Sequence, residues 1–176
     1  MRRIIKRILE YEELAILFFP IVVLYIAPIF HELGHILILK LFSCPMNLRM
    51  SFSFATGLRG HIEPLCELTP VEAIVTLWSG IFMTLILSLM FFFLARKWRK
   101  KVFVPIVMDA TALGFFVSSF IDTLLGKGDI FFILKIVEID VPSYVLSFIT
   151  AVLILIAFVY FWRSLTEEEE ILEEKI

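Results

Sequence analysis

The chain has 176 residues, of which 60% are hydrophobic and only 19% are charged. Soluble domains contain about 45–50% apolar residues, and a chain of this length has too little interior to bury so much apolar surface. The net charge of −2 provides no basic excess that would attract nucleic acid. These values exclude a soluble enzyme and a nucleic-acid-binding module. They predict one membrane domain, residues 1–176, surrounded by the lipid bilayer.

The first 42 residues contain a basic segment and a long apolar stretch. In residues 1–13 the apolar and basic side chains fall on opposite helical faces, which is typical of a helix in the membrane interface and equally of a flank that only orients the next span. Residues 14–42 are almost continuously apolar and exceed the length that crosses a hydrocarbon core of roughly 30 Å. We expect this first transmembrane helix to tilt, to emerge from the membrane or to kink, and Pro20 and Pro28 are the places for a kink.

Residues 46–63 have a different pattern. Apolar and polar residues alternate from Met46 to Phe54, and the alternation resumes after a plausible turn at residues 55–57. A period of two predicts strands, and two such strands joined by a turn predict a β-hairpin.

Three more apolar stretches follow, at residues 71–94, 103–125 and 142–162. Residues 126–141 between the last two are interpreted as a loop with glycine and aspartate followed by a short helix, and residues 163–176 as an acidic tail. The predicted fold is therefore an all-α polytopic membrane protein with about four transmembrane helices and a small membrane-associated β-hairpin between the first two.

The chain contains two cysteines, Cys44 and Cys66. Two cysteines are too few for a disulfide framework. We expect two free thiols, and one bridge between them is the alternative.

His31-Glu32-Leu33-Gly34-His35 is an H-E-x-x-H motif inside the first predicted helix. Positions i and i+4 share one helical face, so both imidazoles can reach one metal ion. The glutamate is about 100° further round the helix, beside such an ion, where a base acting on metal-bound water belongs. Three ionisable side chains inside an apolar run cost several kcal/mol unless something compensates them. A zinc ion compensates both imidazoles together.

A catalytic zinc ion usually has three protein ligands and one open position. The candidates for the third ligand are Asp109, Asp122 and Asp129. Asp109 precedes Asp122 by about 20 Å along a helix, and therefore lies near the membrane surface away from the motif. We favour Asp129, because it lies in a glycine-flanked break where the backbone can bend inward. Asp122 is then the alternative ligand, a partner that orients a ligand, or a solvated carboxylate at a helix end.

With these residues the chain resembles the site-2-protease type of intramembrane zinc metalloprotease over most of residues 14–137. The H-E-x-x-H motif is the most specific part of the resemblance, and a hairpin follows it as in that family. Gly80 stands within the stretch where the family has Ala-Gly-Pro-x-x-Asn, and Gly128-Asp129-Ile130 stands where the family has Leu-Asp-Gly. The resemblance implies that Asp129 completes a zinc site with the two histidines and that one Zn²⁺ is the cofactor.

The resemblance further implies a minimal intramembrane endopeptidase that cleaves transmembrane segments of other proteins, with Glu32 as general base and later proton donor. Such a substrate must unwind locally, because its helical hydrogen bonds hide the scissile carbonyl. We expect the hairpin to accept the unwound segment by β-augmentation. The residues predicted to bind it alternate along the first strand: Met46, Leu48, Met50, Phe52 and Phe54.

Two other functions use the same residues. Intramembrane histidine and aspartate also mark ion paths, so a metal-ion transporter is the first alternative, although it needs polar residues through the full membrane thickness. The second alternative is a catalytically inactive, protease-like membrane scaffold, and the intact Glu32 argues against it.

Lysine and arginine flank the predicted spans unevenly. One membrane side carries Arg2, Arg3, Lys6, Arg7, Arg96, Lys97, Arg99, Lys100, Lys101, Arg163 and Lys175, and the other carries Lys40, Arg49, Arg59, Lys127 and Lys135. The positive-inside rule therefore predicts a multi-pass protein of the cell membrane with both termini in the cytoplasm. The family resemblance implies the opposite orientation, with the active site nearer the cytoplasm, so both orientations stay open at this point.

Overall fold

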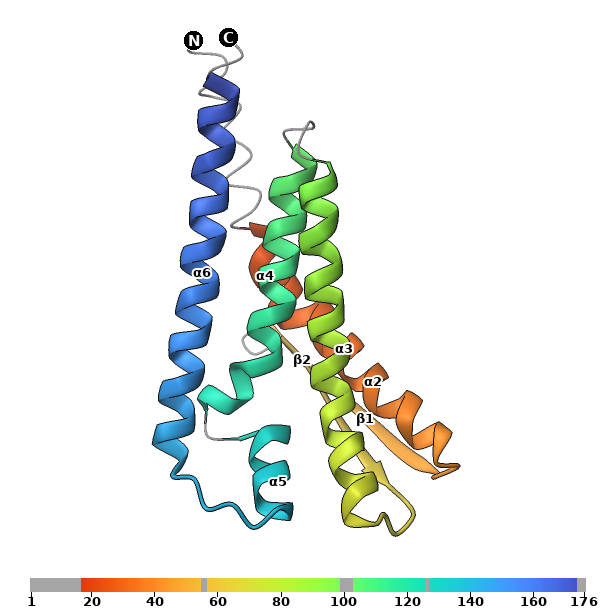
Figure 1. Cartoon of the computed structure of the whole chain (residues 1–176). Coiled ribbons are helices and arrows are strands. Elements are labelled where there is room, and N and C mark those ends of the chain that lie inside the picture. Colours follow the sequence, from red (N-terminus) through yellow and green to blue (C-terminus); the bar gives the residue numbers. More distant parts are fainter. Residues whose placement is uncertain (1–16, 55–56, 99–102, 126, 174–176) are drawn as a thin grey trace.

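A computed structural model describes the chain at residues 17–54, 57–98, 103–125 and 127–173 (Figure 1). The predicted basic segment 1–13 lies outside these residues. In chain order the elements are η1 (Val22–Ile26), α2 (Ala27–Leu41), β1 (Met46–Ser53), β2 (Gly57–Pro64), α3 (Pro70–Lys97), α4 (Phe103–Leu124), α5 (Asp129–Ile136) and α6 (Ser143–Glu173).

The helices that are long and apolar enough to cross a membrane are Leu17–Leu41, Pro70–Lys97, Val104–Leu124 and Ser143–Phe161. The strands β1 and β2 pair in antiparallel fashion between the first two of these helices. The predicted fold class, a polytopic helical membrane protein with a small hairpin, is therefore confirmed. The short α5 lies in the predicted break, and α6 continues into the acidic tail as far as Glu173.

The first span is one helix with a wider, π-helical turn, η1, between Pro20 and Pro28. Pro28 has no N–H to donate to the Leu24 carbonyl, as a regular α-helix requires. Gly57 at the start of β2 lies against this carbonyl, where a Cβ would collide with it, and its φ of +75° is one that glycine adopts without strain. Leu24 is about 25 Å along the helix from Leu41, so the Gly57 end of β2 lies deep in the membrane-spanning region.

Hydroxyl groups join α3 to α4. The Oγ atoms of Thr84 and Ser119 lie 2.7 Å apart, and Ser88 donates a hydrogen bond of 2.7 Å to the Ala112 carbonyl. Hydrogen bonds between helices in lipid contribute about 0.6 kcal/mol each. Most residues of α4 are buried, whereas few of those in the span of α6 are buried. Thus α4 is the central helix, and α6 stands beside it (Figure 1).

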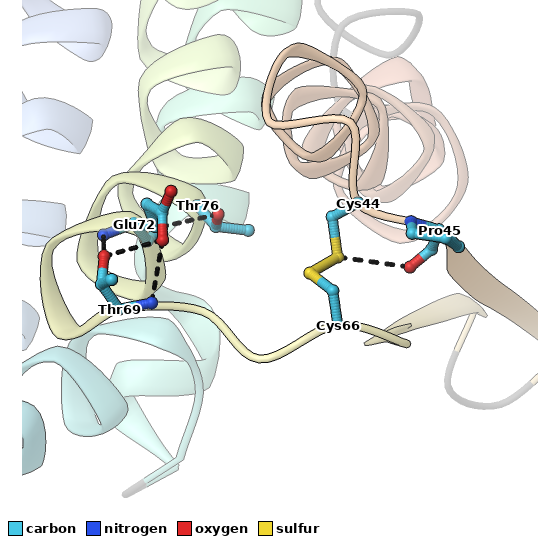
Figure 2. The surroundings of a disulfide bond; sticks show 6 residues. All are labelled: Cys44, Pro45, Cys66, Thr69, Glu72 and Thr76. Carbon is cyan, nitrogen blue, oxygen red and sulfur yellow. Dashed lines mark hydrogen bonds between the residues drawn. A yellow bond between two sulfur atoms is a disulfide. The ribbon is translucent and has the colours of Figure 1, made fainter.

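A capping box fixes the start of α3 (Figure 2). The Thr69 hydroxyl accepts a hydrogen bond of 3.3 Å from the Glu72 backbone N–H, and the Glu72 carboxylate accepts one of 2.9 Å from the Thr69 N–H. Pro70 occupies the first turn, where its missing N–H costs nothing. The reciprocal bonds satisfy backbone donors that would otherwise lack partners at the helix end.

The two cysteines form a disulfide, so the prediction of free thiols is wrong (Figure 2). The hairpin returns the chain to its starting point, because β1 and β2 pair along their full length. Just beyond them, the Leu65 N–H donates to the Pro45 carbonyl at 2.8 Å. This pairing brings the Cα atoms of Cys44 and Cys66 to 5.6 Å, a usual separation for a disulfide. The bridge closes the base of the hairpin.

Candidate metal centre

The helix α2 carries His31 and His35 one turn apart on the same face. Their Nε2 atoms are 3.1 Å apart, and the ring centroids are separated by 4.8 Å. Gly34, next to His35, lies where α2 meets α3, because a Cβ at this position would collide with the Ser79 carbonyl. The missing side chain therefore lets the two helices approach closely beside the histidines.

Gly80 of α3 lies against both imidazole rings. A Cβ at this position would be 2.6 Å from Nε2 of His35 and 2.8 Å from Nε2 of His31. Atoms of real side chains essentially never approach so closely. The two rings thus occupy the space that any side chain at position 80 would fill.

Asp129, in the first turn of α5, completes the group. Gly128 precedes it with a φ of +89°, in the left-handed region that glycine adopts easily. The Oδ2 atom of Asp129 is 2.9 Å from Nε2 of His31 and 3.2 Å from Nε2 of His35. The structure therefore brings together the three residues that the sequence predicts as metal ligands.

The other two aspartates are outside this group, although Asp122 lines the same cavity as the three ligands. Asp122, near the end of α4, is exposed, and its carbonyl accepts hydrogen bonds from the N–H groups of Leu125 and Lys127, so it shapes the turn toward α5. Asp109 is buried and forms an ion pair of 3.3 Å with Arg96. Among the residues that the structure describes, neither aspartate joins the metal-ligand group.

The donor set fits a zinc ion. Ligand atoms that share a tetrahedral Zn²⁺ at about 2.0–2.1 Å lie about 3.3 Å apart, and the three separations among His31, His35 and Asp129 are 2.9, 3.1 and 3.2 Å. His35 donates from Nδ1 to the Thr76 carbonyl at 2.7 Å. A hydrogen bond of this kind fixes the tautomer in which Nε2 keeps its lone pair for a metal.

Asp129 is also in the protonation state that a cation requires. Burial raises the pKa of its carboxyl group, but the interactions with the adjacent His31 and His35 side chains outweigh burial and hold that pKa well below its ordinary value. The carboxylate form is the one that ligates metals. Asp129 therefore offers a negative charge to an ion that the two imidazoles would hold with it.

Glu32 lies beside the ligands and, with them, lines a cavity of about 780 Å³. Gly60 of β2 packs against its side chain, since a Cβ on Gly60 would overlap the side-chain carbons of Glu32 and approach Oε1 to 2.7 Å. A glycine inside a strand often marks such an approach. The strand β2 thus holds the glutamate at the cavity wall, next to the metal ligands.

The strand that borders the cavity is β2. All five residues from Leu58 to Ile62 line it. Because successive side chains of a strand point to opposite faces, this consecutive run indicates that the edge of β2 faces the cavity. The ring of Phe52, on β1, instead contacts Tyr25 of η1 at 5.8 Å.

The residues predicted to bind substrate lie on β1 and just beyond it: Met46, Leu48, Met50, Phe52 and Phe54. In the part of the chain that the structure describes, none of the five lines the cavity. Their role in binding stays a prediction, and the strand edge of β2 is better placed for it.

Three positioning groups were not predicted from the sequence: the Thr76 carbonyl, Gly60 and the contact of Gly80 with both rings. The Thr76 carbonyl carries no side-chain signal at all. For Gly60 a signal exists, because a glycine inside a predicted strand often marks a close approach of another group. Gly80 signals close helix packing, but nothing in the sequence shows that the packed groups are the imidazoles.

No protein-family model, curated protein or solved structure matches this chain. The chemistry of the site therefore follows from its own residues. These are three converging metal ligands, a carboxylate beside them, and a cavity bordered by a strand edge.

Proposed function

We propose that the protein is an intramembrane zinc metalloendopeptidase that cleaves transmembrane segments of other membrane proteins. The observation that supports this most is the convergence of His31, His35 and Asp129 with Glu32 in the same cavity. A Zn²⁺ ion bound by these residues would act as a Lewis acid and would lower the pKa of its bound water to about 7.

Each residue of the site then has one role. His31, His35 and Asp129 hold the metal, and the Thr76 carbonyl keeps His35 in the ligating tautomer. Glu32 accepts a proton from the attacking water and later passes it to the leaving amine. In the part of the chain that the structure describes, Glu32 has no hydrogen bond or ion pair that would occupy its carboxylate.

The cavity suits an unwound transmembrane segment. Leu58 and Ile62 line it from β2, and Ile130 and Phe132 line it from α5. The apolar side chains of a transmembrane substrate can therefore pack against apolar residues of the cavity. The edge of β2 offers backbone hydrogen-bonding groups to a segment that has lost its helical bonds. Binding along this edge brings the scissile carbonyl near the metal ligands and Glu32.

The hydroxyl groups of the α3–α4 interface favour hydrolysis over metal transport. Thr84 is hydrogen bonded to Ser119, and Ser88 to the Ala112 carbonyl, so these buried groups join two helices. A transporter instead needs polar groups that a moving cation can bind through the whole membrane. An inactive scaffold does not require the carboxylate of Glu32 beside the three metal ligands.

The experiment is to purify the protein in detergent, remove metal with a chelator, restore Zn²⁺ and add a set of transmembrane peptides. We expect cleavage only with the metal. Zinc uptake by liposomes that contain the protein, without peptide cleavage, would support the transporter instead. Binding of peptides with neither activity would support the scaffold.

We also place the protein in the cell membrane, with both termini in the cytoplasm. The uneven distribution of lysine and arginine around the four spans supports this orientation.

A further inference from the structure

We propose that the metal centre opens toward the oxidising, non-cytoplasmic side of the membrane, and that its substrates are segments whose scissile bond lies in that half of the bilayer. The statement about substrates rests on the proposed protease function. The orientation itself depends only on the disulfide and on the distribution of charge.

The disulfide and the metal centre lie at the same end of the molecule. Cys44 follows α2 closely, and its N–H donates to the Leu39 carbonyl at 2.9 Å. Leu39, one turn after His35, lines the metal-site cavity, and so does Leu68, just after Cys66. The bridged base of the hairpin is therefore next to the cavity.

The ligands also lie in the half of the membrane near the bridge. The first span extends from Leu17 to Leu41. His35 is about 9 Å along the helix from Leu41 but about 27 Å from Leu17. A substrate segment that reaches Glu32 must therefore be cut in the half of the bilayer on the bridged side.

A disulfide at this end indicates an oxidising compartment. Cytoplasmic thiols are kept reduced, whereas disulfides persist outside the cytoplasm. Formation of the bridge releases two protons from Cys44 and Cys66 and passes two electrons to the disulfide-forming oxidoreductases of such a compartment.

The opposite end carries more of the basic residues. Arg96 and Lys97 end α3, residues 99–101 add three more basic side chains to the sequence, and Arg163 lies on α6. Figure 1 shows this end of α3 far from α5, and α6 continues past it. Short basic loops stay in the cytoplasm. Charge and disulfide, which are independent observations, thus indicate the same orientation.

Two matched reporters test the orientation. Lys135→Cys on α5 and Lys97→Cys at the end of α3 place one thiol at exposed positions of opposite ends. Each is made in the native chain, whose own cysteines are bridged, and again with Cys44→Ser and Cys66→Ser. Intact cells are treated with a membrane-impermeant maleimide. We expect Lys135→Cys to react before permeabilisation and Lys97→Cys only after it. The reverse pattern would overturn the proposal.

The native chain provides a second measurement that needs no variant. Alkylation of intact cells, with and without prior reduction, reports whether Cys44 and Cys66 are bridged. We expect modification only after reduction, and free thiols without reduction would overturn the proposal. Neither measurement requires catalysis. A chain that labels as expected but cleaves nothing refutes the protease alone, and one that cleaves but labels in reverse refutes the orientation alone.

Discussion

Replacing Gly80 by alanine should weaken zinc binding at the metal centre without changing any ligand. The added Cβ would lie 2.6 Å from Nε2 of His35, whereas ordinary contacts begin at 3.4 Å. The imidazole or α3 must therefore move by about 0.8 Å to restore an ordinary contact. Metal sites tolerate deviations of only about 0.2 Å in ligand distance. The displacement exceeds this tolerance, and zinc binding should weaken.

The assay is a competition titration of purified, detergent-solubilised protein with a zinc-chelating dye. We expect the zinc affinity of Gly80→Ala to fall by about 10–100-fold, the range found when groups that orient metal ligands are changed. The matched control is Gly114→Ala, whose Cβ would lie 2.7 Å from Cγ1 of Val22. This control introduces a similar overlap away from the metal ligands. It should lower thermal stability and leave zinc affinity unchanged.

Two results would refute the role of Gly80. Unchanged zinc affinity in Gly80→Ala would mean that the rings move without loss of coordination. An equal loss in both variants would mean that general unfolding, rather than displacement of the imidazoles, releases the metal.

Three further predictions concern the ligand, the base and the bridge. Asp129→Ala should lower zinc affinity far more than Asp122→Ala in the same titration, because Asp129, unlike Asp122, places a carboxylate oxygen next to the histidines. The reverse ranking would mean that Asp122 of α4 is the third ligand. Gly60→Ala should keep zinc but lower the cleavage rate up to about 100-fold by displacing the base, and an unchanged rate would contradict this. Replacing Cys44 and Cys66 by serine should destabilise the fold by about 3 kcal/mol, the value for a loop of this length, measured by denaturant unfolding; no change would show that the bridge does not constrain the hairpin.

The helices and the hairpin could be predicted because their signals are local. A continuous apolar stretch has no other stable place than the bilayer, and a period of two over residues 46–54 has no helical interpretation. His31 and His35 are likewise related by local helix geometry. Asp109 could be set aside because its level in the membrane follows from the order of the spans, and Asp129 could be favoured over Asp122 because glycines flank it.

The remaining features depend on packing between distant segments. Whether Cys44 meets Cys66 depends on the register of the whole hairpin. The sequence also presents two equivalent strand edges, and only the packing of the hairpin on the first span places β2 rather than β1 at the cavity. For the same reason the predicted substrate-binding residues lie on the strand that is further from the metal ligands.

The most direct test of the central claim is the combined zinc content and cleavage rate of Glu32→Gln. Glutamine keeps the size of the side chain but cannot accept the proton of the attacking water. The variant should bind zinc as tightly as the native chain, because Glu32 is not a ligand. Its cleavage rate should be lower by about 10²–10⁴-fold, the contribution of a general base. A zinc-loaded variant that cleaves at the native rate would contradict the account.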